Sequence, residues 1–379
     1  MTKYMIELTK GLLSKFTGLN NKSVSGTILP PADLSSEQQA LRDLVPGLLF
    51  TSSSGAKCFS YEFGQSSYLA IPIYLSDEHS HALTLESQNE ILADRPIGSH
   101  FLYLADKLSL LPRKICPNWV EENIVGPAQA DGVDLEVIRE CMQPLSVFKI
   151  FPSHLLLSSL PSPYIADYIC TFETDLCAST SIHSDSVQII RELFLSEKLH
   201  FFGENLFHAL AAASLRHSFL EAYKLLEFTF ILPRADDLIN TLNEHGSSLN
   251  LSLIEFAKQC SNKLGWRRQE RDSIGRIFRD YADHDLSAFI NLAGSCEPFR
   301  SIDTVPNLGD PTEKVNIFVQ KLADRFYDLR NQVVHQLWPD DEFNCKPVDW
   351  NALILFTLQC VRWVYDKHLL AVSQYCENA

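Results

Sequence analysis

The spacing of apolar residues changes near residue 185. Before that point, short apolar runs are separated by frequent Pro and Gly residues, which is typical of a domain with many turns. After it, apolar residues recur at intervals of three and four over long segments, which indicates amphipathic helices. The pattern therefore predicts a mixed α+β domain over residues 1–185 and an all-α helical bundle over residues 186–379.

The first domain is expected to mix short helices and strands. Helices are predicted at 4–16, 35–44 and 101–111. Strands are predicted at 47–51, 57–63, 67–75, 148–151, 155–160 and 164–172. Gly64-Gln65-Ser66 separates the second strand from the third, and this spacing favours a hairpin connection.

The second domain is expected to contain long helices. They are predicted at 207–230, 249–264, 274–292, 311–338 and 347–372. The fourth begins with Asp310-Pro311-Thr312-Glu313, in which Asp310 suits the N-cap, Pro311 the first helical residue and Glu313 the reciprocal capping acid.

The helix expected at 311–338 has one apolar stripe with core spacing. Its members are Val315, Phe318, Leu322, Phe326, Leu329, Val333 and Leu337. His335 lies two residues beyond Val333, roughly 200° around the helix, and Asn331 is one turn before His335. Both polar side chains should therefore point away from the core of the bundle.

A second stripe on the same helix mixes aromatic and polar residues. It consists of Tyr327, Asn331, Val334 and Trp338. Such a face favours a second packing partner, and the simplest candidate is the same helix of another subunit. We therefore expect a homodimer with Tyr327, Val334 and Trp338 at the interface.

Three residues of this helix carry candidate chemistry. Arg330, Asn331 and His335 place a permanent cation, an amide and an imidazole within six residues. These groups bind phosphate and transfer protons near neutral pH.

The surrounding segment, LADRFYDLRNQVVH over residues 322–335, resembles the signature helix of HEPN-domain proteins, many of which are metal-independent ribonucleases. The resemblance covers residues 190–375. It implies a composite active site at a dimer interface, with no metal and no cofactor. His335 would act as general base or acid while the RNA 2′-OH attacks phosphorus, leaving a 2′,3′-cyclic phosphate. Arg330 would hold the phosphate, and Asn331 would orient His335 or the phosphate.

The Arg-to-His spacing alone is not specific, because the chain contains it four times. The pairs are Arg95/His100, Arg279/His284, Arg330/His335 and Arg362/His368. Only Arg330 is followed by Asn and by apolar residues before the histidine, within a helix that has a start signal and an apolar stripe. Toxins of this family that are modified on tyrosine carry Arg-x4-His-x-Tyr, whereas Leu337 occupies the tyrosine position here.

Charge restricts how the chain could meet RNA. The net charge of −15 opposes general nucleic-acid binding, because the phosphate backbone repels an acidic surface. One candidate basic patch comprises Lys263, Arg267, Arg268, Arg271, Arg276 and Arg279. We expect RNA contact at Arg267, Arg268 and Arg271; the alternative is a solvated helix face with ion pairs, because Glu270, Asp272 and Asp280 interrupt the patch.

Weaker patterns occur elsewhere in the chain. Asp77-Glu78-His79-Ser80-His81 could supply metal ligands, because its two histidines would share one face of a strand. The alternative is a polar turn. Glu221 or Glu227 could orient Arg330 or His335 across the bundle; otherwise they are ordinary exposed or capped carboxylates. The ten cysteines form no metal-binding spacing and are expected to be buried thiols.

These patterns favour a cytoplasmic protein, because no apolar run approaches the roughly 18 residues of a membrane span and the first residues lack a signal pattern. The function expected from the resemblance is a HEPN-type endoribonuclease in a defence or toxin system, with RNA as substrate and an antitoxin or defence-system protein as partner. The first domain would sense a trigger, restrain the nuclease or select RNA. The alternatives are a non-catalytic HEPN binding or dimerisation module in a larger complex and an unrelated helical scaffold.

Overall fold

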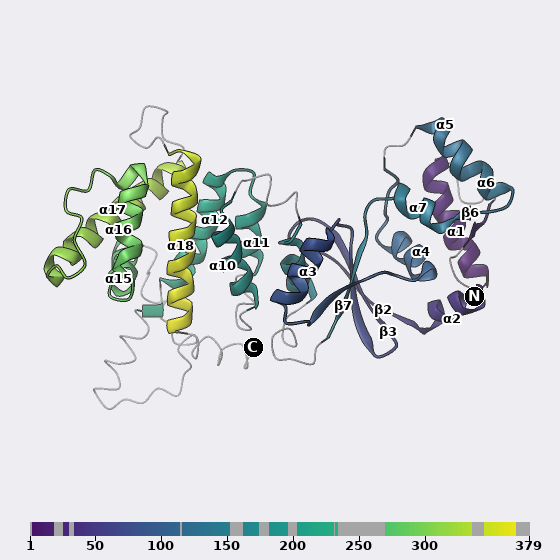
Figure 1. Cartoon of the computed structure of the whole chain (residues 1–379), viewed down its shortest axis with the longest axis horizontal. Coiled ribbons are helices and arrows are strands. Elements are labelled where there is room, and N and C mark those ends of the chain that lie inside the picture. Colours follow the sequence, from purple (N-terminus) through teal and green to yellow (C-terminus); the bar gives the residue numbers. More distant parts are fainter. Residues whose placement is uncertain are drawn as a thin grey trace. The chain divides into compact units, whose positions relative to one another are not determined.

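The computed structural model divides the chain into two compact units, Met1–Thr174 and Asp175–Ala379 (Figure 1). It describes residues 2–18, 26–29, 34–113, 116–151, 162–173, 182–195, 203–230, 232–233, 270–335 and 345–368. The first unit mixes helices with a sheet and the second is largely helical, so the α+β fold class predicted from the hydrophobic pattern is confirmed. The division lies about eleven residues before the boundary at 185 that the pattern suggests.

An antiparallel sheet organises the first unit. Its strand order is β2-β3-β4-β7-β5, formed by Leu44–Thr51, Lys57–Phe63, Ser66–Ile71, Ser146–Ile150 and Ile91–Asp94. Strands β3 and β4 pair from Phe63 and Ser66 outward, which is the hairpin predicted from the sequence. Gly64 in this turn has φ of +63°, a left-handed conformation that glycine adopts without steric cost.

Helices and a short parallel pair complete the first unit. The helices are α1 (Thr2–Thr17), α2 (Leu34–Asp43), α3 (Asp77–Glu86), α4 (Gly98–Lys107), α5 (Pro117–Val120), α6 (Gly126–Gln129), α7 (Leu135–Cys141) and α8 (Ser162–Cys170), with a π-helical turn at Glu121–Val125. Strands β1 (Ile28–Leu29) and β6 (Val133–Asp134) pair in parallel. Lys15 of α1 donates to the carbonyls of Ala105 and Leu110, each at 2.9 Å, which joins α1 to the end of α4.

The strand predicted at 164–172 is wrong, because these residues form helix α8. A short apolar run does not distinguish a buried strand from a buried helix. Most side chains of α8 are buried, and buried Asp167 accepts hydrogen bonds from the backbone N–H and the hydroxyl of Ser53, at 2.9 and 2.6 Å. The strand predicted at 155–160 lies outside the described residues.

The second unit is a helical bundle around α17 and α18 (Figure 1). Its helices are α10 (Ser184–Leu195), α11 (Gly203–Ala211), α12 (Leu215–Thr229), α15 (Glu270–Ala282), α16 (Leu286–Ser295), α17 (Thr312–His335) and α18 (Pro347–Lys367), with a 3₁₀ turn at Glu297–Phe299. Helix α18 packs against α10, α12, α15 and α16, and α17 packs against α12 and α15. In the described segments, no helix has the length and apolarity needed to cross a membrane.

Two helices predicted as continuous are each interrupted. The helix predicted at 207–230 is divided into α11 and α12, and Ser214 caps α12 by accepting from the His217 N–H at 3.4 Å. The helix predicted at 274–292 is divided into α15 and α16, where Asp285 accepts from the Ala288 N–H at 3.2 Å. In both cases a short polar side chain competes for backbone groups within an apolar period. The helix predicted at 249–264 lies outside the described residues.

Free thiols occur in both units. Of the cysteines in the described segments, five are buried: Cys58, Cys141, Cys170, Cys296 and Cys360. Cys116 is exposed and Cys345 is half-buried. The expectation of buried thiols therefore holds for most of the cysteines that the structure describes.

Aromatic rings around Phe326 form the centre of the bundle. Phe326 is fully buried, and its ring centroid lies 5.2–6.5 Å from those of Phe219, Tyr223, Phe278, Phe299 and Phe356. These rings belong to α12, α15, the 3₁₀ turn and α18, so one side chain of α17 joins four neighbouring elements. Aromatic pairs at these distances stabilise a core beyond their buried area.

We predict that Phe326→Ala lowers the free energy of unfolding by about 3–5 kcal/mol, because it leaves a cavity at the meeting point of four elements. Phe228→Ala, at a ring that is 49% exposed, should cost about 1 kcal/mol or less. Urea unfolding followed by circular dichroism measures both variants. Equal losses would show that Phe326 is not the centre of the packing.

Candidate functional site

Helix α17 positions the candidate residues. Its buried side chains are Phe318, Val319, Leu322, Ala323, Phe326, Leu329 and Val333. They include five of the seven residues of the predicted apolar stripe; Val315 is half-buried, and Leu337 lies outside the described residues. Asp310, expected to cap the helix, accepts from the Asn307 N–H at 2.7 Å and from Lys314 Nζ at 2.6 Å, and the hydrogen bond from Lys314 lowers its pKa.

Arg330 lies inside a cluster of polar side chains, and its own side chain is 20% exposed. Its Nη2 atom is 2.5 Å from Glu227 Oε1 on α12 and 3.4 Å from Glu270 Oε1 on α15. Its Nη1 atom donates to Asn331 Oδ1 at 3.0 Å. The guanidinium therefore joins α17 to two other helices.

Tyr223 is the remaining member of this group, which we call the Arg330 cluster and which comprises Arg330, Asn331, Glu227, Glu270 and Tyr223. The guanidinium carbon of Arg330 lies 5.0 Å from the centroid of the Tyr223 ring, a cation–π distance. The Tyr223 hydroxyl donates to Glu270 Oε1 at 2.7 Å. Burial, followed by the charge of Glu270, raises the pKa of Tyr223 far above its ordinary value, so the hydroxyl keeps its proton.

Two carboxylates compete for one guanidinium in the Arg330 cluster. Burial raises the pKa of Glu227, Arg330 opposes that rise, and the charge of Glu270 adds to it. Burial alone would lower the pKa of Arg330, but Glu227, Tyr223 and Glu270 together raise it, so Arg330 stays charged. The cluster is neutral when Glu227 holds a proton and carries one negative charge when both carboxylates are ionised.

His335 and Asn331 lie on the side of α17 away from its buried stripe. His335 is exposed in the last turn, and Asn331 is half-buried. Arg216 of α12 donates to the carbonyl of Val333 at 3.2 Å, which gives one of the last carbonyls of α17 a partner. The prediction that Asn331 and His335 avoid the core is therefore consistent with their exposure, and Arg216 adds a cation at this helix end.

The second stripe is only partly open to a partner. Tyr327 is half-buried, and the guanidinium carbon of Arg271 lies 4.9 Å from the centroid of its ring. Val334 is 44% exposed, and Trp338 lies outside the described residues. The surface available to a second subunit at this end of α17 thus includes Val334, Asn331 and His335.

The candidate RNA-binding residues are placed only in part. Arg267 and Arg268 lie outside the described residues. Arg271 is half-exposed and pairs with Asp328 at 2.5 Å and with Asp324 at 3.8 Å. Arg279 donates to Gln320 Oε1 at 3.2 Å. Arg271 is therefore engaged with acidic groups of α17, and RNA contact there stays a prediction.

The other three Arg/His pairs have different surroundings. His100 is buried against Tyr61 and Phe63 and bonds the Ala40 carbonyl at 3.1 Å, while burial lowers its pKa. Arg362 pairs with Glu192, and His368 is buried. His284 is exposed at the start of the turn before α16.

The structure offers no metal site in the segments it describes. No group of three or more potential ligands among His, Cys, Asp and Glu occurs there. The segment at 77–81 begins helix α3, so His79 and His81 point roughly 200° apart rather than sharing a strand face.

Tyr223 and Glu270 were not predicted as members of the Arg330 cluster. Glu227 was predicted, together with Glu221, as an acidic residue that could orient Arg330 or His335 across the bundle. Tyr223 follows the apolar period of its helix, so the sequence assigns it to the core, and Glu270 was noted only as an interruption of a basic patch. The sequence signal for Glu270 is its position as an acidic residue just before the helix predicted at 274–292.

No family model matches the chain, and no curated protein or solved structure matches it.

The raised pKa of Glu227 predicts a pH dependence of stability. A carboxyl whose pKa is higher in the folded protein contributes stability below its unfolded pKa, and that contribution is lost as pH rises through the folded pKa. Glu227→Gln should therefore become more stable relative to wild type as the pH rises from about 4.5, the ordinary carboxyl pKa, toward neutrality. Urea unfolding at the two ends of this range measures the difference.

The matched control is Glu297→Gln, which removes an exposed carboxylate 2.6 Å from Arg300 in the same unit. It should keep the pH dependence of wild type. If Glu227→Gln behaves in the same way, the burial of Glu227 beside Glu270 does not raise its pKa in solution.

Proposed function

We propose that the helical unit is a metal-independent endoribonuclease of the HEPN type, with His335 as the proton-transfer group. The observation that supports this most is the arrangement of α17. It holds Arg330 in a defined cluster and leaves the imidazole of His335 exposed in its final turn. An exposed imidazole is suited to general base or acid catalysis on the RNA 2′-OH.

In this proposal Asn331 connects the two functional ends of the site. Its side chain accepts a hydrogen bond from Arg330, and it lies one turn before His335 on the same side of the helix. Asn331 would thus orient the phosphate or the imidazole relative to Arg330. The reaction would transfer a proton from the 2′-OH, form the 2′-oxygen–phosphorus bond and release the 5′-oxygen, which takes up a proton.

Charge balance limits the role of Arg330. Glu227 and Glu270 already balance its charge, so a phosphate that approached the cluster would meet at least one carboxylate. Phosphate binding at Arg330 requires proton uptake by Glu227 or exchange of the longer, 3.4 Å contact with Glu270. In the proposed homodimer, a second copy would also bring a second His335 and a second Arg216 to the scissile phosphate.

RNA, a second copy of the chain and an antitoxin or other defence-system protein remain proposed partners. A defence or toxin role and a cytoplasmic location belong to the same proposal. The first unit would then sense a trigger, restrain the nuclease or select RNA.

A second candidate function is a non-catalytic binding or dimerisation module of the same family. The specific observation that favours it is the closed Arg330 cluster, in which the guanidinium stabilises the bundle through Glu227, Glu270 and Tyr223. In that case Arg330 serves packing, and His335 is an ordinary surface histidine.

RNA cleavage in the presence of EDTA distinguishes the two functions. We expect wild type to cut RNA, to leave a 2′,3′-cyclic phosphate and to spare an oligonucleotide without 2′-OH groups. His335→Ala should lose about 10²- to 10⁴-fold in rate, and Arg330→Ala about 10²- to 10³-fold. Thermal unfolding of Arg330→Ala separates a catalytic loss from a loss of folded protein.

Arg362→Ala and His284→Ala are matched controls, because each alters one residue of another Arg/His pair of the same unit. Both should keep the activity of wild type. Equal cleavage by wild type, His335→Ala and Arg330→Ala would contradict the nuclease proposal. A wild type that is folded but does not cut RNA would favour the non-catalytic module.

A further inference from the structure

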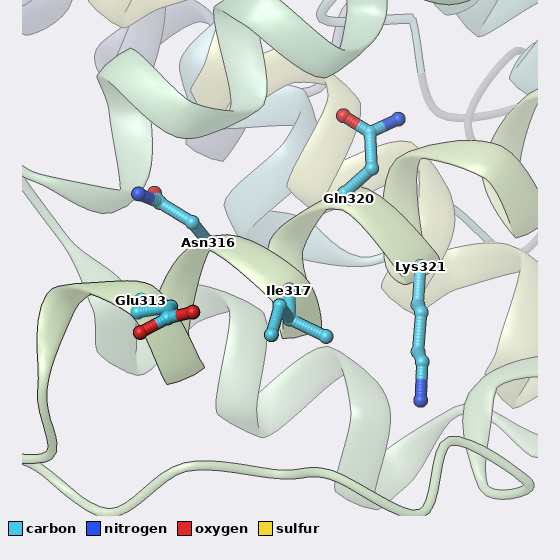
Figure 2. Close-up of a pocket in the computed structure, with 5 residues that line it drawn as sticks. All are labelled: Glu313, Asn316, Ile317, Gln320 and Lys321. Atoms are coloured by element: carbon cyan, nitrogen blue, oxygen red, sulfur yellow. The ribbon is translucent and has the colours of Figure 1, made fainter.

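The N-terminal half of α17 exposes a second surface that the Arg330 site does not use. Figure 2 shows Glu313, Ile317 and Lys321 in one row along the helix, with Asn316 and Gln320 in the neighbouring row. These five residues line a shallow cavity of about 560 Å³. Ile317, in the middle of the row, is 49% exposed.

The segment before α17 adds apolar surface beside this row. Thr304 accepts from Lys321 Nζ at 3.5 Å, and Asp310 accepts from Lys314 Nζ at 2.6 Å. Residues 304–310 therefore run back along the first turns of α17. Val305 and Leu308, between these two contacts, are 42% and 75% exposed. Three exposed apolar side chains thus come from two adjoining segments, which we call the Ile317 surface.

The charges of the Ile317 surface are arranged symmetrically. Glu313 lies four residues before Ile317 and Lys321 four residues after it, so an acid and a base flank the apolar residue at equal spacing. Both charged residues lie on exposed positions of the same i±4 row. A two-fold axis through Ile317 would place Glu313 of each copy opposite Lys321 of the other, with the two Ile317 side chains in contact.

The geometry of helix packing permits this contact. Rows of i±4 residues on two helices align when the helix axes cross at about −50°. Gln320, in the neighbouring row, is already engaged by Arg279 at 3.2 Å and by Asp324 at 3.3 Å within the chain, so the contact would centre on the Glu313–Lys321 row. We propose that the Ile317 surface is a two-fold contact between two copies of this chain.

This contact differs from the one that would build a composite nuclease site. His335 lies eighteen residues beyond Ile317, about 27 Å along the helix. Two antiparallel copies that meet at Ile317 would hold their His335 side chains about 50 Å apart. The Ile317 contact therefore leaves Val334 and His335 open, and it does not depend on whether the chain is a nuclease.

Charge exchange tests the proposed pairing. Glu313→Lys places like charges opposite each other at two points of the dimer, and so does Lys321→Glu. Each variant alone should weaken self-association at least about tenfold, because two attractive pairs become repulsive. The double variant Glu313→Lys/Lys321→Glu restores both pairs and should associate like wild type. An equimolar mixture of the two single variants should form heterodimers, although each variant associates only weakly with itself.

Sedimentation velocity of the full chain over a concentration series measures these outcomes. The matched control is Asp272→Lys, which makes the same charge change in the first turn of α15 and should leave self-association unchanged. Circular dichroism checks that each variant is folded. Failure of the double variant and of the mixture to recover association would overturn the proposed pairing, as would a wild type that stays monomeric throughout.

Aspartate substitutions separate this contact from the one proposed at the other end of α17. Ile317→Asp should reduce self-association at least as strongly as the charge variants. If Val334→Asp abolishes association and Ile317→Asp does not, the Ile317 contact is wrong and the composite nuclease site retains its dimer. The opposite result supports the Ile317 contact and removes the support for a dimer at the His335 end, and the cleavage assay then shows whether RNA is cut without that dimer.

Discussion

Packing around Phe326 is the interaction on which the second unit depends. One ring of α17 meets rings from α12, α15, the 3₁₀ turn and α18, so the position and rotation of α17 are set by several neighbours at once. Rotation of α17 decides which residues leave the core. Arg330, one turn beyond Phe326, is consequently directed toward Tyr223, Glu227 and Glu270, whereas His335 reaches the exposed side.

The polar cluster beside this aromatic core has opposite consequences for stability and for chemistry. Arg330 with two carboxylates and a tyrosine ring holds three helices together, and this favours a single arrangement of the bundle. The same contacts balance the guanidinium charge, so Arg330 is not a ready receptor for phosphate in this state. A catalytic role requires a change in the protonation of Glu227 or in the contact with Glu270, and that requirement links pH, stability and activity at one site.

Periodicity predicted the existence and type of most elements, but it failed where tertiary contacts decide. The hairpin between β3 and β4 followed from a short turn between two apolar runs. The residues of helix α8 were predicted as a strand, because a short apolar run is consistent with either structure. The hydrogen bonds between Ser53 and Asp167 form only in the folded chain, so the sequence does not reveal them. The breaks before α12 and α16 were missed, because Ser214 and Asp285 act as caps only when the chain turns there.

The sequence by itself determined the two-part organisation, the apolar stripe of α17 and the exposed side that carries Asn331 and His335. These follow from residue spacing along one chain segment, which depends only on the pitch of the helix. Only the tertiary structure decided that Arg330 is bound by Glu227 and Glu270, that Arg271 is engaged with Asp324 and Asp328, and that Ile317 is left exposed. Those facts depend on which helices become neighbours, and residues far apart in sequence meet only after the core has packed.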